Sequence, residues 1–419
     1  MTLQLSKHTE AFMEQSKTIR YFCILQFLTY GSVGLWPYGL SYFRSLGLSS
    51  SEVGLISACG TFLCLFGLPL MGILADRRRA ARKLLLLTLI VLIPVQLLIP
   101  VLGETAHATI TAPAVFLMLA VLAATTFFGE RNIITMMDSW SGDAMDRLNL
   151  NYGTCRMFGC LCYILVSFTA SALLGKHLPV WLCFVIMPAI SLPMILLASG
   201  KRGAAFDTPR TNTVQKEKTS TLLRMVFRNY NYVTYLLLVL GFYAFQSIVD
   251  LDLTYLMDHV GAPHSSIGLI GGYRACCELV VMLVLSRCKK LPPLWVLLSC
   301  CGLLVAAEHL LYPTVTSLPG LIALATMTGV GGGLFFGCNA SYVYKIVDPR
   351  AGSTAMSVQG VCLASMGILG SMAAGSIIDR FGLTVLTGGV GILMLTTTLL
   401  FAGSRLLLLR KNSNSAGTM

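Results

Sequence analysis

Residues 72–102 read GILADRRRAARKLLLLTLIVLIPVQLLIPVL, and this stretch already indicates the class of fold. Its second part, 84–102, is a run of 19 residues without a charge. A helix needs roughly 20 apolar residues to cross a bilayer core about 30 Å thick. The first part ends an earlier apolar run and then places five basic residues before the second one. The stretch therefore predicts two membrane helices joined by a short basic loop.

Comparable apolar runs recur along the whole chain. We predict twelve membrane helices, with approximate spans 21–43, 53–75, 84–102, 109–137, 153–175, 179–199, 232–256, 265–286, 292–311, 318–343, 355–374 and 383–403. Hydrophobic residues make up 55% of the 419 residues, charged residues 11%, and the mean hydropathy is +0.76. Soluble proteins carry about 25% charged residues, and the short alternating segments of a membrane barrel are not seen. Because backbone groups in lipid must bond within the chain, the prediction is an all-α integral membrane protein, with the long run 109–137 tilted or kinked.

The basic residues set the expected topology. With the N-terminus placed inside, 26 of the 30 Lys and Arg residues fall on the inner side. The outer loops hold Arg44, Lys176 and Arg380, and one arginine lies within a span. The positive-inside rule then places both termini in the cytoplasm, with the first helix acting as a signal anchor in the cell (inner or plasma) membrane. The net charge of +12 reflects this topology, and we expect no nucleic-acid partner.

The longest polar stretch divides the chain in two. It runs from Gly200 to Asn229, carries seven basic residues, and has six predicted helices on either side. The predicted parts are an N-terminal six-helix bundle, a basic cytoplasmic linker, a C-terminal six-helix bundle and a short cytoplasmic tail, at 1–199, 200–229, 230–404 and 405–419. Two pseudo-symmetric bundles joined in this way are typical of a duplicated transporter.

Cysteines and glycines indicate packing rather than chemistry. Most of the 14 cysteines lie inside apolar runs, and they form no CxxC pair. The six histidines do not accompany them at zinc spacing. The run Gly329-Val330-Gly331-Gly332-Gly333 lies within a predicted helix, where it favours close helix contacts over a phosphate loop. With no nucleophile and base pair either, we expect no metal, no cofactor and no enzymatic activity.

Several motifs carry a family resemblance. The segment from Gly72 to Arg77 resembles the Gly-x-Leu-Ala-Asp-Arg signature of the major facilitator superfamily. In it, Gly72 is expected to let helices approach, and Asp76 to cap or pair at the basic surface. Residues 152–160, YGTCRMFGC, resemble the start of helix 5 in the lactose permease family, and residues 375–382, GSIIDRFG, also resemble the phenylpropionate-permease-like group. The resemblance implies a secondary transporter that works by alternating access.

Charged residues within membrane helices are costly and mark functional sites. Asp138 and Arg156 stand 18 residues apart on successive helices, and the lactose permease family carries an acid and this arginine at that separation. Tyr163 matches the position of the family's tryptophan, which offers an aromatic face to a sugar ring. The resemblance implies substrate binding by these three residues. The alternative is a salt bridge at a helix end.

The second half offers two further groups. Arg274 and Glu278 are four residues apart and share one helix face. They either neutralise each other for insertion, or face a cavity where Arg274 binds substrate and Glu278 a proton. Glu308 and His309 are adjacent, and we assign them to proton coupling. The alternative is a near-surface pair, because the predicted helix ends close by.

Three points remain open from the sequence. Asp250 matches an acidic, largely structural position of the family, but it could equally face outer water with Asp252. Glu130 and Arg131 interrupt a membrane span, and the sequence does not choose their partners. The lactose permease family also carries Lys, His and Glu on helix 10 for coupling. Here those positions fall near the apolar residues Leu324, Met327 and Val330.

We therefore expect a monomeric proton symporter for a sugar, glycoside or oligosaccharide, driven by the proton gradient and surrounded by membrane lipid. A permease for an aromatic or other organic anion, or for a nucleoside, is the alternative. A membrane sensor with the same fold, which binds its ligand without transport, is a further one.

Overall fold

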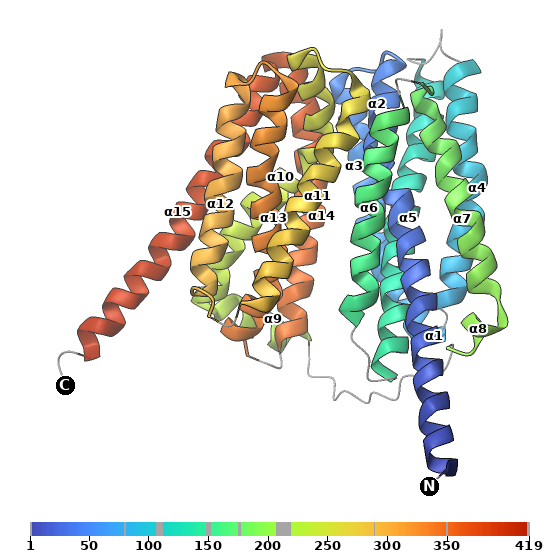
Figure 1. Ribbon diagram of the computed structural model, residues 1–419. Coiled ribbons are helices and arrows are strands. Elements are labelled where there is room, and N and C mark those ends of the chain that lie inside the picture. Colours follow the sequence, from blue (N-terminus) through green and yellow to red (C-terminus); the bar gives the residue numbers. More distant parts are fainter. Residues whose placement is uncertain are drawn as a thin grey trace. The chain divides into compact units, whose positions relative to one another are not determined.

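The computed structural model describes residues 2–78, 81–105, 112–147, 152–174, 177–206, 219–288, 290–348 and 351–416. Regular structure in these ranges is helical, apart from one isolated bridge between Leu174 and Leu178 (Figure 1). The prediction of an all-α membrane protein is confirmed. Contacts divide the chain into two compact units, which we call unit 1 (residues 1–48 and 59–212) and unit 2 (residues 49–58 and 213–419).

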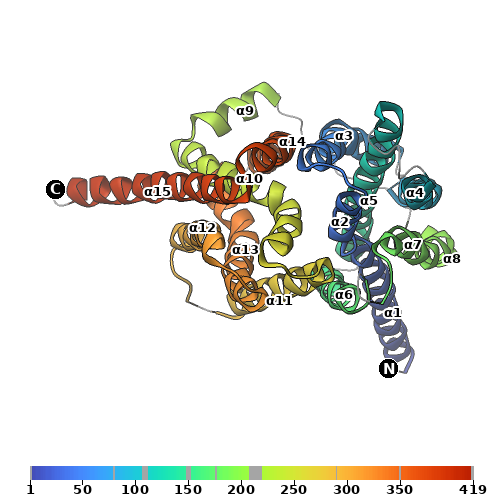
Figure 2. The ribbon, with the colours of Figure 1, turned by 90° about the horizontal axis from the view of Figure 1, so that it is seen from above.

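Unit 1 is built from long apolar helices. They are α1 (Thr2–Val33), α2 (Trp36–Ser45), most of α3 (Ser50–Arg78), α4 (Ala81–Thr105), α5 (Pro113–Arg147), α6 (Tyr152–Leu173) and α7 (Cys183–Ser199), with the short η2 (Val180–Leu182) and α8 (Lys201–Ala204). Helix α1 packs against α5, α6 and α7, and α4 packs against α5 and α7 (Figure 2). Aromatic contacts link these helices, since Trp140 of α5 meets the rings of Tyr21 and Phe22 on α1.

The predicted span 21–43 is interrupted in its middle. Helix α1 ends at Val33 and α2 begins at Trp36. Pro37 explains the interruption, because proline has no backbone N–H to donate to the carbonyl four residues earlier, that of Val33. The motif Gly34-Leu35-Trp36-Pro37 thus makes a discontinuous membrane helix, which the hydropathy pattern alone does not predict.

Unit 2 contains the remaining helices. They are α9 (Thr219–Arg228), α10 (Tyr230–Val260), η3 (His264–Ser266), α11 (Ile267–Arg287), α12 (Leu294–Leu311), η4 (Tyr312–Thr314), α13 (Leu318–Ile346), α14 (Gly352–Phe381) and α15 (Leu383–Ala416). Helix α13 packs against α11 and α12, and α10 packs against α14 and α15 (Figure 2). The ring of Phe242 on α10 stacks on Phe335 of α13 with centroids 3.8 Å apart.

The glycine run on α13 lets that helix approach two neighbours at once. A Cβ placed at Gly329 would lie 2.6 Å from Cys277 Cβ, and one at Gly333 would lie 2.7 Å from Val281 Cβ, both on α11. A Cβ at Gly331 would lie 3.0 Å from Val305 on α12. Any side chain at these positions would push the helices apart, so close packing is the role of this run, as the sequence predicts.

The first nine residues of α3, up to Ala58, belong to unit 2 by their contacts. The backbone N–H groups of Ser50 and Ser51 donate to the carboxylate of Asp379 on α14, at 3.1 and 2.7 Å. A carboxylate at a helix N-terminus satisfies free N–H groups and faces the positive end of the helix dipole. Gly375 makes room for this contact, since a Cβ there would strike the carbonyl of Ser50.

Eleven helices within the described residues are long and apolar enough to cross a membrane. They correspond to all of the twelve predicted spans except 21–43, which falls on α1 and α2. Residues 113–137 of the long run lie on α5, which continues unbroken for 35 residues from Pro113 to Arg147.

Candidate functional site

Asp138 lies on α5 and contacts α1. Its carboxylate Oδ1 accepts a hydrogen bond of 3.0 Å from Gln26 Nε2, and the same amide nitrogen donates to Ser141 Oγ at 3.0 Å. Gln26 is fully buried and Asp138 half-buried. The amide therefore holds the carboxylate in a fixed place against the face of α1.

Arg156 lies near the start of α6 and contacts the same face of α1. Its guanidinium carbon is 4.0 Å from the centre of the Tyr30 ring, which is a cation–π distance. Gly159 permits this approach, because a Cβ there would lie 2.5 Å from the ring. Gln26 and Tyr30 are four residues apart on α1, so they share one face of that helix. Because Gln26 contacts Asp138 and Tyr30 contacts Arg156, the structure brings the two predicted residues to one region of unit 1.

Tyr163 lies on the same helix as Arg156, α6. It lies seven residues, or about two helical turns, after Arg156. Its backbone carbonyl is 3.5 Å from where a Cβ of Gly34 would lie, at the break between α1 and α2. The half-buried Tyr163 and the Asp138–Arg156 region thus lie along one interface, between α1 and its neighbours α5 and α6.

Unit 2 holds a buried ion pair. Arg274 Nη2 on α11 lies 3.0 Å from Glu308 Oε1 on α12, and the two side chains are 11% and 0% exposed. The same nitrogen donates to the hydroxyl of Tyr312 at 2.5 Å, and this hydroxyl donates to Glu308 Oε1. Arginine is suited to such sites because its planar guanidinium stays charged and donates in fixed directions. Glu308 and His309 are both buried, and α12 ends shortly after them at Leu311.

His309 and Glu278 flank this pair differently. His309 Nδ1 lies 3.1 Å from the Val305 carbonyl, and its ring meets the rings of Phe245 and Tyr312 edge-on at 5.0 Å. A carbonyl can only accept, so Nδ1 carries the hydrogen. Glu278 is half-buried and points towards α13, where its Oε2 would be 3.4 Å from a Cβ at Gly332. Glycine at that position leaves space beside this carboxylate.

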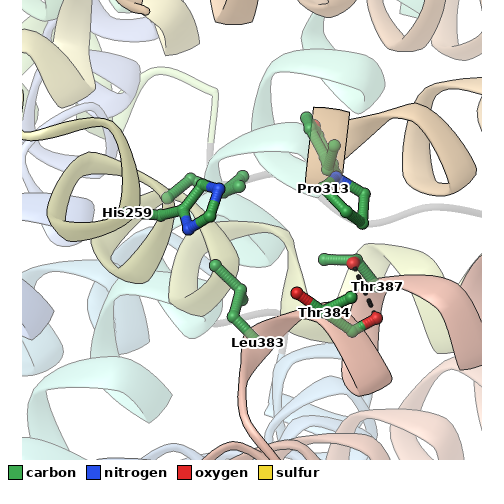
Figure 3. A pocket seen from close by; sticks show the side chains of 7 residues that line it. His259, Pro313, Leu383, Thr384 and Thr387 are labelled. Carbon is green, nitrogen blue, oxygen red and sulfur yellow. Dashed lines mark hydrogen bonds between the residues drawn. The ribbon is translucent and has the colours of Figure 1, made fainter. Parts of the chain in front are cut away.

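A small pocket in unit 2 reaches Tyr312. It is lined by Leu256, His259, Tyr312, Pro313, Leu383, Thr384 and Thr387. Figure 3 shows His259 and Pro313 on opposite sides, with Leu383 and Thr384 below them. The pocket lies where α10, η4 and α15 meet, so it is next to the residue that joins Arg274 to Glu308.

The structure gives less information on the remaining predicted residues. A Cβ at Gly72 would meet none of the described atoms within 4 Å, so the described residues show no close contact at this glycine and its predicted role stays a prediction. The side chains of Asp76, Arg77 and Asp250 lie outside the described part of the chain. Their predicted roles stay predictions. Among the described residues, no group of three or more His, Cys, Asp or Glu could hold a metal ion.

The sequence reasoning missed the partners of the predicted charges. Gln26, Tyr30 and Tyr312 each fix one of them, and no motif marks these residues. Of these three partners, only Tyr312 could have been predicted from helical spacing. It lies four residues after Glu308, so the two share a face of the helix that continues from α12 into η4.

An all-helical fold with membrane-length helices and a buried ion pair is that of a multi-pass membrane protein. Comparison with known proteins gives the family and points to a transporter rather than an enzyme. The chain matches the model of the MFS_1 like family over residues 19–386. It therefore belongs to this family, as the resemblance to the major facilitator superfamily predicts.

Individual relatives agree with this assignment. An uncharacterized transporter, YwbF, of Bacillus subtilis (strain 168) is 24% identical over 360 residues, covering 85% of this chain and 83% of that protein. The crystal structure of the nucleoside transporter NupG is similar with a TM-score of 0.70 and 16% identity, covering 92% of this chain and 98% of that one. A POT family transporter in complex with 5-aminolevulinic acid is similar with a TM-score of 0.71 and 13% identity, covering 92% and 95%. At these identities the two structures show a common fold.

Proposed function

We propose that this transporter is a proton-coupled symporter of a small sugar, glycoside or oligosaccharide that works by alternating access. The observation that carries the proposal is the row of polar and aromatic groups along α1 in unit 1. Asp138 is held by Gln26, and Arg156 is held over Tyr30. Tyr163, whose backbone carbonyl lies beside Gly34, is the further aromatic residue that we assign to the substrate.

These groups match the chemistry of a sugar. Hydroxyl groups both donate and accept, so they need a carboxylate and a guanidinium at fixed positions. The faces of sugar rings are apolar and pack on aromatic side chains. The Asp138 carboxylate, the Arg156 guanidinium and the Tyr30 ring supply these kinds of group within unit 1. We assign Tyr163 as a further aromatic contact.

The pair in unit 2 provides a means of coupling. While Glu308 is ionised, it holds the Arg274 guanidinium at 3.0 Å. We assign Glu308 to the proton exchange, and loss of its negative charge would weaken its contact with Arg274, which we assign to a polar group of the substrate. Glu278 and His309 lie on the same helices, and we assign them to the same proton exchange. The proton gradient is then the energy source, with no further cofactor.

A nucleoside is the second candidate substrate. It is favoured by the similarity in fold to the nucleoside transporter NupG over 92% of the chain. A nucleoside combines the hydroxyls of a sugar with an aromatic base, so the same tyrosines and charged groups suit it. An organic anion would need Arg156 and Arg274 to hold its carboxylate.

Binding measurements on purified protein test the unit 1 site. Asp138→Asn and Arg156→Lys should each weaken binding of the preferred sugar more than tenfold while thermal stability stays close to that of the wild type. Lysine keeps the charge but loses the planar guanidinium. Glu104→Gln is the control, because Glu104 is an exposed acid at the end of α4 that accepts from Tyr42. Wild-type affinity in both site variants would contradict the proposal.

We further propose that the protein is a monomer in the cell membrane, with both termini in the cytoplasm and lipid around it. The excess of Lys and Arg in the predicted inner segments supports this orientation. Protease access to an N-terminal tag in right-side-out vesicles tests it. Protection is expected, and cleavage would contradict the orientation.

Binding without any uptake in proteoliposomes would favour the sensor alternative.

A further inference from the structure

A second buried carboxylate, Glu130, lies in the middle of unit 1. It is 17 residues from either end of α5, so about 25 Å of helix extends on each side of it. Its exposed fraction is 5%, and it falls within a candidate membrane span. A charge at this depth is expensive, so a glutamate here marks function unless its environment neutralises it.

The groups around Glu130 are neutral. Oε1 accepts from Ser32 Oγ of α1 at 2.6 Å and from Gln96 Nε2 of α4 at 2.8 Å. Helix α7 adds the thioether of Met187, which lies 3.8 Å from Gln96 Nε2. The charge that acts on Glu130 within the described residues is that of Arg131, which is exposed on α5 with its guanidinium carbon 5.3 Å from the Phe127 ring centre.

Two buried acceptors at this site have no donor. Glu130 Oε2 and Gln96 Oε1 are both buried without a hydrogen-bond partner among the described residues. An ionised carboxylate only accepts, whereas a protonated one also donates. A proton on Glu130 therefore supplies the kind of group that the site lacks, and it removes the cost of a buried charge that two neutral donors offset only in part.

Glu308 provides the contrast. It is also fully buried, but a guanidinium lies 3.0 Å away. A fixed cation stabilises the ionised form, while neutral donors leave protonation favourable. The two buried glutamates thus differ in their surroundings, since Glu308 faces a guanidinium and Glu130 accepts from neutral donors.

We propose that Glu130 is a proton-binding site that carries its proton in the state described by the structure and releases it during the transport cycle. Binding forms one O–H bond, –COO⁻ + H⁺ → –COOH, and release reverses it. The role in transport rests on the proton coupling proposed above.

The helix break in unit 1 offers a means of release. Ser32, which donates to Glu130, is the last residue but one of α1, and the chain is not helical at Gly34 and Leu35. Discontinuous helices form ion sites in transporters because their ends can move and leave backbone groups available. A movement at this break would remove the Ser32 hydroxyl from Glu130 and change the affinity of the carboxylate for a proton.

Infrared spectroscopy of the full chain in lipid tests protonation directly. At neutral pH, the wild type should show a carbonyl stretch from a protonated carboxyl group. Glu130→Gln should remove this band, and Glu104→Gln, which changes an exposed acid, should retain it. Persistence of the band in Glu130→Gln, or its absence from the wild type, would overturn the proposal.

Transport in proteoliposomes tests the coupling. Glutamine resembles the protonated acid, so Glu130→Gln should retain exchange of labelled for unlabelled substrate and lose at least tenfold of the accumulation driven by a pH gradient. A purely structural Glu130 predicts unchanged driven accumulation in this variant, and that result would overturn its role in coupling. If the wild type itself ignores the gradient, proton symport is wrong, and the infrared band alone decides whether Glu130 holds a proton.

Discussion

The buried pair of Arg274 and Glu308 allows a quantitative test. The contact measures 3.0 Å and the glutamate is fully buried, so the removal of either partner breaks a charged contact inside the protein. Breaking a buried pair in this way costs about 3–5 kcal/mol of stability. We expect Arg274→Gln and Glu308→Gln each to lower the free energy of unfolding by an amount in this range.

The double variant is more informative than either single one. Arg274→Gln with Glu308→Gln removes both charges and leaves two amides that can bond to each other. Its loss of stability should be smaller than the sum of the two single losses by about 1–3 kcal/mol, the usual size of coupling between contacting residues. The free energy of unfolding of the wild type, the two single variants and the double variant is measured in mixed micelles. Sodium dodecyl sulfate unfolds the protein, and tryptophan fluorescence monitors the transition.

Additive losses would refute this reasoning, because they would show that the two side chains do not interact. If a single variant lost less than about 0.5 kcal/mol of unfolding free energy, as a surface substitution does, the result would contradict a charged pair buried at this position. Glu104→Gln serves as the control for loss of an exposed carboxylate and should change the stability by less than that amount.

Other substitutions test packing and substrate contact. Gly333→Ala should destabilise the protein by about 1–3 kcal/mol, because the added Cβ would lie 2.7 Å from an α11 side chain. Gly388→Ala, at a position with open space, should instead stabilise by up to about 1 kcal/mol through helix propensity. The same unfolding titration measures both, and equal effects would argue against close packing of α13 on α11. Tyr163→Phe should keep the affinity for a sugar within about threefold, whereas Tyr163→Ala should reduce it more than tenfold by loss of the ring, about the 1.4 kcal/mol that a tenfold change represents. Equal affinities of the two variants in a binding assay would exclude a stacking role.

Much of the fold follows from local composition. Runs such as 84–102 predict membrane helices because a bilayer imposes one length and one polarity on every span. The role of Gly329–Gly333 in close packing is predicted for the same reason, since small residues have few other uses inside an apolar helix. The break at Gly34 is harder to predict from Pro37, because proline also occurs often in membrane helices that are not interrupted.

The partners of the charged residues depend on tertiary structure. Helical spacing predicts that Arg274 and Glu278 share a face, but the ion pair of Arg274 is with Glu308, 34 residues away on another helix. Glu130 shows the same limit, because its neighbours Ser32 and Gln96 come from two other helices. Sequence spacing reports neighbours on one helix and contains no information on which helices pack together.

Uptake into proteoliposomes under an imposed pH gradient tests the account most directly. The panel holds labelled sugars, nucleosides and aromatic acids, each measured with and without a protonophore. We predict that the gradient drives accumulation of a sugar and that the protonophore abolishes it. Accumulation of an anion or a nucleoside alone would contradict the proposed substrate, and uptake that ignores both the gradient and the protonophore would contradict proton coupling.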